Sequence, residues 1–116
     1  EMSSAGHLFT KEYSQKTLLL AEKHPDFVFG FITQHAISTD PRWINMTPGI
    51  QLNGGIDTLG QQYVTPEMAI NHHGADVIIV GRGIIHATNP QEMAVTYRAA
   101  GWHAYQNRLK NKQKDL

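Results

Sequence analysis

The sequence predicts an α/β fold built on a parallel sheet. The first observation is the run Val77 to Val80, four branched apolar residues without polar alternation, which is typical of a strand buried on both faces. The second is that apolar runs alternate along the chain with segments that carry helix-start residues. Crossovers between parallel strands bring the strands' carboxyl ends to one edge of the sheet, so we expect a ligand site at that edge.

Length and composition limit the class of protein. The 116 residues suffice for one domain with a single core, and ten basic residues balance ten acidic ones. This balance gives no electrostatic reason to expect nucleic acid or a membrane surface as a partner. Cysteine is absent, which excludes disulfides and thiolate metal sites. No apolar run is long enough to span a bilayer and no signal-peptide pattern opens the chain, so we expect a soluble, cytoplasmic protein.

The first part of the chain predicts a helix followed by two strands. Thr10 suits an N-cap, and the helix is expected to run to Lys23. Helical spacing puts four residues on its buried face, namely Tyr13, Thr17, Leu20 and Ala21. Buried strands are expected at residues 27–32 and 43–47, the second ended by Pro48.

Residues 50–64 predict a long loop with little periodicity, and loops of this length are often functional. Gln61, Gln62 and Tyr63 supply amide and phenol groups that could bind a phosphate and a heterocycle. The alternative is a loop whose polar groups satisfy one another.

Two further helices complete the predicted pattern. Thr65-Pro66-Glu67 has the residues of a helix start, and that helix is expected to end at Gly74. Asn89-Pro90-Gln91-Glu92 starts another helix, expected to run to about Lys110. Its inner stripe comprises Met93, Tyr97, Ala100 and Ala104, which we interpret as core packing. The cations at its end, Arg108, Lys110, Lys112 and Lys114, are interpreted as a solvated tail.

The turn Gly81-Arg82-Gly83 follows the central strand and is the best candidate for binding an anion. Glycine allows close approach of a ligand to the backbone, and the guanidinium offers a planar set of donors suited to phosphate. The alternative is an ordinary strand-to-helix turn with a surface arginine. The turn lacks the third glycine of a dinucleotide site and the lysine of a nucleotide P-loop, so no NAD or ATP site is indicated. The seven histidines show no zinc-site spacing, so we expect no metal.

Several short motifs, in order, resemble orotidine 5'-phosphate decarboxylase, especially the decarboxylase part of bifunctional UMP synthase. They are Met2-Ser3-Ser4-Ala5-Gly6, Thr47-Pro48-Gly49, Asp57-Thr58-Leu59-Gly60-Gln61-Gln62-Tyr63, Ile78-Ile79-Val80-Gly81-Arg82-Gly83-Ile84-Ile85 and the helix Tyr97 to Tyr105. The resemblance covers nearly the whole chain. It implies that residues 1–116 are a partial domain, the C-terminal half of a (β/α)8 TIM barrel.

The resemblance also implies roles for individual residues. Ser3 would hydrogen-bond the pyrimidine edge, and Pro48 would pack beside the base. Gln61 would bridge phosphate and base, and Tyr63 would contact the phosphate. Gly81 and Arg82 would hold the phosphate after the eighth strand, where barrels frequently bind this group. The family converts orotidylate to UMP and carbon dioxide in pyrimidine synthesis, without metal or organic cofactor.

The family's catalytic Asp-x-Lys-x-x-Asp motif is absent, because no aspartate has a lysine at that spacing. We therefore expect this chain to bind phosphate and pyrimidine, and to be inactive as a carboxy-lyase without the N-terminal half of the barrel. The resemblance also implies a homodimer, in which the partner supplies one catalytic aspartate. Two alternatives remain: another sugar-phosphate barrel enzyme, and a non-catalytic nucleotide-binding half-barrel.

Overall fold

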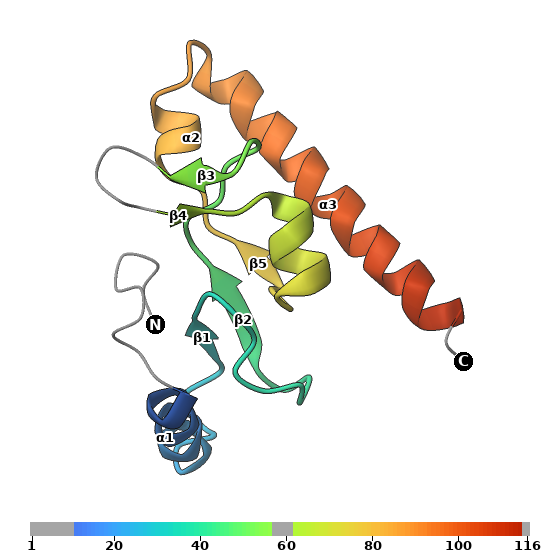
Figure 1. Cartoon of the computed structure of the whole chain (residues 1–116). Helices are drawn as coiled ribbons and strands as arrows, with labels where there is room; N and C mark the ends of the chain where they lie inside the picture. The colour runs from blue at the N-terminus through green and yellow to red at the C-terminus, as the bar shows by residue number, and fades with distance from the viewer. Residues whose placement is uncertain (1–10, 57–61, 115–116) are drawn as a thin grey trace.

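A computed structural model describes residues 11–56 and 62–114. In this part of the chain, helices and strands are interspersed as the sequence predicts, but four strands follow the first helix without a helix between them (Figure 1). In chain order the elements are α1 (Lys11–Glu22), β1 (Gly30–Ile32), β2 (Ile44–Thr47), β3 (Gly55–Ile56), β4 (Gln62–Tyr63), the π-helical η2 (Met68–His72), β5 (Val77–Ile78), α2 (Arg82–Ile85) and α3 (Pro90–Lys114).

The strands β1, β2 and β5 form one parallel sheet in that order, which confirms the predicted parallel arrangement. Met46 of β2 is in register with Ile32 of β1 on one side and Val77 of β5 on the other. In Figure 1, α3 runs alongside β5, and α1 lies at the opposite end of the structure from α2.

Residues 50–64 differ from the predicted loop. β3 and β4 form an antiparallel hairpin, and Ile50 forms a parallel bridge with Val64 at its base. The strands have only two residues each, too short to give a period-2 pattern in the sequence. The segment is therefore anchored to the fold at its root.

Within residues 11–56 and 62–114, one face of the sheet is covered by other elements and the other is not. Phe31 and Trp43 pack against Ala21 of α1, while Ile50, Ile70 and Tyr97 belong to a second core between the hairpin, η2 and α3. The other face carries four apolar side chains that are 38–45% exposed: Ile32, Ile44, Val77 and Ile79. The prediction that the central strand is buried on both faces is thus wrong for this structure, because nothing described covers its second face.

Helix α1 begins and ends close to the predicted bounds, and its predicted buried face is confirmed at Ala21 but not throughout. Ala21 is buried and Leu18 packs beside it, whereas Tyr13 and Leu20 are 49% and 62% exposed. The predicted buried face is therefore wrong for those two residues. Thr10, the expected cap, lies outside the described residues.

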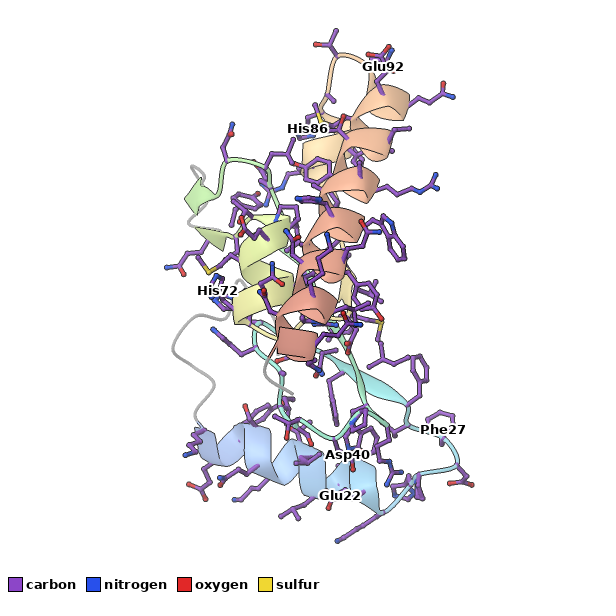
Figure 2. All side chains as sticks on the ribbon, turned by 90° about the vertical axis from the view of Figure 1, so that its right-hand side faces the viewer. Glu22, Phe27, Asp40, His72, His86 and Glu92 are labelled. Carbon is purple, nitrogen blue, oxygen red and sulfur yellow. The ribbon has the colours of Figure 1, made fainter. Side chains whose placement is uncertain are left out.

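The first predicted strand is shorter than expected. Phe27 and Phe29 are 84% and 63% exposed, and only Gly30–Ile32 forms β1. Phe27 projects away from the rest of the structure in Figure 2. The aromatic run is apolar enough to suggest a buried strand, but none of the residues that the structure describes covers its first half.

The predicted caps of the later helices are confirmed. The Thr65 hydroxyl accepts a hydrogen bond from the Met68 amide at 3.2 Å, and the Asn89 side chain accepts one from the Glu92 amide at 3.2 Å. Gly74 has φ +81°, the left-handed conformation that favours glycine after a helix. No helix in the described ranges is long and apolar enough to cross a membrane.

Arg108 contradicts the expectation of a solvated tail. Its guanidinium donates to the carbonyls of Ile70 at 3.2 Å and Ala75 at 2.9 Å, and its Nη2 lies 3.3 Å from Asp76 Oδ1. The other Asp76 oxygen accepts the Asn45 amide at 2.8 Å. Arg108 therefore ties α3 to η2 and to the amino ends of β2 and β5, a long-range role that helix position alone does not reveal.

Candidate functional site

The candidate site lies where β2 and β5 end. Ile79 donates its amide to the Thr47 carbonyl at 2.8 Å, so the residues after both strands emerge at the same edge of the sheet. Pro48 follows β2 at this edge, and Gly81 follows the extended residues after β5. The Gln34 side chain, after β1, donates to the Pro48 carbonyl at 3.5 Å. Gln34 was not among the predicted site residues.

The hairpin root joins this edge directly. The Val64 amide donates a hydrogen bond to the Gly49 carbonyl at 3.0 Å, and the Gln51 amide donates one to the Val64 carbonyl at 3.0 Å. These two bonds hold the end of β4 against the residues that follow Pro48. Tyr63, one residue before Val64, is thereby brought to the carboxyl edge of the sheet.

Arg82 and Tyr63 meet at this edge. The Arg82 guanidinium carbon lies 5.7 Å from the centre of the Tyr63 ring, within the range of a cation–π contact. A methyl group built on Gly81 would meet nothing within 4 Å, so the backbone beside Arg82 faces open space. The arginine is exposed and accessible to a ligand. An accessible guanidinium beside an open backbone is suited to a phosphate or carboxylate.

The structure brings together four of the seven predicted site residues: Pro48, Tyr63, Gly81 and Arg82. Gln62 precedes Tyr63 in β4 and is exposed, and alternation along a strand directs its side chain to the opposite face. Ser3 and Gln61 lie outside the described residues.

Below the site lies the side chain of Tyr97, which is 4% exposed. Its hydroxyl accepts a hydrogen bond from the Leu52 amide at 3.2 Å. A methyl group on Gly83 would overlap that same hydroxyl. Tyr97 was expected in the core, and it is there, but helical periodicity does not indicate that its hydroxyl contacts two segments of the site.

The histidines provide no metal centre in residues 11–56 and 62–114, where no group of three potential ligands occurs. The rings of His35 and His73 are in contact, with their centres 4.1 Å apart and their planes tilted by 42°. Burial lowers the pKa of His73 below its usual 6.5, and the neighbouring His35 and His72 lower it further. This pair lies between the loop after β1 and the end of η2.

Asp76 has a structural role because both its carboxylate oxygens are engaged, one by Arg108 and the other by the Asn45 amide. It precedes β5, whereas the site follows that strand, so Asp76 lies at the opposite edge of the sheet. The described part of the site thus offers groups for binding an anion, and Asp76 is not positioned to take part there as an acid or base.

A family model and individual relatives both connect the chain with the same family. Residues 1–97 match the family model described as "Orotidine 5'-phosphate decarboxylase / HUMPS family". The chain is 50% identical over 109 residues to uridine 5'-monophosphate synthase of Bos taurus, a match that covers 94% of this chain and 23% of that protein.

Two fungal proteins named orotidine 5'-phosphate decarboxylase are also similar. The protein of Schizosaccharomyces pombe is 52% identical over 111 residues, covering 94% of this chain and 42% of its own length. That of Aureobasidium pullulans is 46% identical over 108 residues, covering 91% and 40%. The chain therefore spans less than half the length of each of these relatives.

Proposed function

Because the chain belongs to the orotidine 5'-phosphate decarboxylase / HUMPS family, we propose that it forms the phosphate- and pyrimidine-binding part of an orotidine 5'-phosphate decarboxylase. The complete enzyme would be a carboxy-lyase that converts orotidylate to UMP and carbon dioxide. The observation that carries this proposal is the meeting of Arg82 and Tyr63 at the carboxyl edge of the sheet. That pair is accessible, cationic and placed where α/β folds bind phosphates.

Within this function, each candidate residue has a proposed role. Arg82 would donate to the phosphate oxygens, and the open backbone at Gly81 would admit them closely. Tyr63 would donate its hydroxyl to the same group, and Pro48 would pack beside the pyrimidine.

The remaining candidates would complete the contacts to the nucleotide. Ser3 and Gln61 would hydrogen-bond the pyrimidine edge and bridge it to the phosphate. Gln62 would add a polar contact to the nucleotide only from the opposite face of β4, where its side chain is exposed.

Binding the phosphate can lower the barrier at a distant carboxylate. Contacts that hold a non-reacting part of the substrate can stabilise the transition state by orienting the reacting part and closing a loop over it. The pair of strands β3 and β4 suits this task because it is rooted at Ile50 and Val64 and carries Tyr63 on its second strand. No organic cofactor is required by this proposal.

The decarboxylating groups would come from another part of the protein. An aspartate and lysine array of the form Asp-x-Lys-x-x-Asp does not occur in the 116 residues. We propose that the N-terminal half of a (β/α)8 barrel supplies it, and that the complete enzyme is a cytoplasmic homodimer. By itself the chain should bind the phosphate weakly and release no carbon dioxide.

The uncovered sheet face supports the half-barrel proposal. Parallel sheets are normally covered on both faces, yet Val77 and Ile79 are 45% and 38% exposed. A groove of about 1110 Å³ between β5 and α3 is lined by Val77 and by Trp102, which is itself 59% exposed. A strand and a helix from the proposed N-terminal half would cover these residues.

Reconstitution tests the function. The chain is mixed with the N-terminal half of the barrel, and loss of orotidylate absorbance is followed. The proposal predicts turnover by the pair and none by either half. A correctly assembled pair that binds UMP but leaves orotidylate unchanged would contradict the decarboxylase assignment. Stronger competition by another sugar phosphate than by UMP would favour a different barrel enzyme.

A further inference from the structure

Tyr97 links two segments that the proposed function uses. Its ring belongs to the same core as Ile50 and Ile70, and the residue is 4% exposed. The hydroxyl at the end of the ring accepts the Leu52 amide at 3.2 Å. Leu52 lies between the hairpin root and β3, so this bond fixes the outgoing arm of the segment that returns as Tyr63.

The same hydroxyl supports the turn that carries Arg82. A methyl group on Gly83 would overlap the Tyr97 hydroxyl and lie 3.0 Å from its Cζ. A methyl group on Gly81, two residues earlier, would meet nothing within 4 Å. Glycine is therefore required at position 83 because the turn rests against Tyr97, whereas no such contact restricts position 81.

We propose that Tyr97 is a positioning residue for substrate phosphate. This inference rests on the proposed function. One buried oxygen contacts both the hairpin that carries Tyr63 and the turn that carries Arg82, so it sets the spacing between the two groups that would grip the phosphate. Because α3 holds the ring rigidly in the core, the spacing is established before a ligand binds, which reduces the ordering cost of binding.

The test uses the chain assembled with the rest of its barrel. Tyr97→Phe removes only the hydroxyl, and Tyr105→Phe on the same helix is the matched control, since Tyr105 stacks on Trp102 away from the site. Loss of one hydrogen bond predicts a decrease in kcat/KM for orotidylate of about threefold to tenfold. For orotidine, the nucleoside without phosphate, kcat/KM should not change. Tyr105→Phe should leave both values unchanged.

The substrate comparison separates positioning from a structural effect. An equal decrease for orotidylate and orotidine would mean that Tyr97 only stabilises the fold, and no decrease for either would remove it from the site. Both results overturn this inference. Absence of turnover by the wild-type assembly would instead contradict the proposed function.

Gly83→Ala tests the same contact by changing the residue that faces the Tyr97 hydroxyl. The added methyl should push the turn away from the hydroxyl and lower kcat/KM for orotidylate more than for orotidine. Combining it with Tyr97→Phe, which makes room for the methyl, should restore part of the loss. Strictly additive effects of the two substitutions on kcat/KM would show that the Tyr97 hydroxyl does not contact the turn. If Tyr97→Phe fails to fold, the comparison of orotidylate with orotidine in Gly83→Ala is the test.

Discussion

Replacing Arg108 with methionine should weaken the packing of α3 on the sheet. Arg108 is largely buried, and its guanidinium makes two hydrogen bonds to the carbonyls of Ile70 and Ala75. Hydrogen bonds that involve a charged group contribute about 1.5 to 3 kcal/mol each when well shielded, and for these two partly buried bonds we expect about 1 to 1.5 kcal/mol each. The ion pair with Asp76 adds little, at most about 1 kcal/mol, because that carboxylate is 38% exposed.

Together these contacts predict that Arg108→Met lowers the free energy of unfolding by about 2 to 4 kcal/mol. Urea unfolding followed by the fluorescence of the buried Trp43 measures the change. Lys110→Met is the control, because this lysine is exposed on the same helix and its replacement should change the free energy by less than about 0.5 kcal/mol. Equal stability of the two variants would refute the assigned role of Arg108.

Two further predictions concern the residues that follow η2. Gly74→Ala should destabilise the fold by about 1 to 3 kcal/mol in thermal or urea unfolding, because the φ of Gly74 is +81° and the new methyl group would lie 2.8 Å from Ala36 Cβ. Unchanged stability would exclude that backbone conformation. Because the pKa of His73 is lowered in the folded protein, the unfolded chain binds more protons as the pH falls below 6.5. The contribution of His73 to stability is therefore present above pH 6.5 and is lost as the pH falls through the folded pKa. His73→Phe should flatten this pH dependence of the free energy of unfolding, and an unchanged profile would contradict the prediction.

Local signals predicted the order of the fold well. The caps at Thr65 and Asn89 are side chains that bond amides within three residues, so the sequence suffices to find them. The parallel arrangement follows from the alternation of strands and helices. The short hairpin and the burial of individual faces depend on contacts between distant segments, and the sequence pattern carries little information about those.

Part of the candidate site could also be predicted from the sequence. Arg82 and Tyr63 could be proposed because glycine turns and polar loop residues mark places where ligands approach the backbone. The contacts of Tyr97 and Arg108 could not, because each spans more than 30 residues of sequence and ends on backbone groups. A helical stripe predicts which side chains are buried, but not which backbone group a buried hydroxyl or guanidinium meets.

Arg82 is expected to bind the phosphate of a nucleotide at the carboxyl edge of the sheet. The most direct test of this expectation is calorimetric binding of UMP and of uridine to the assembled protein, with Arg82→Ala compared with Arg42→Ala, an exposed arginine just before β2 at the opposite edge. Arg82→Ala should weaken UMP binding about 10-fold to 150-fold and leave uridine binding unchanged, whereas Arg42→Ala should alter neither. UMP affinity that is the same with and without the Arg82 guanidinium would contradict the account.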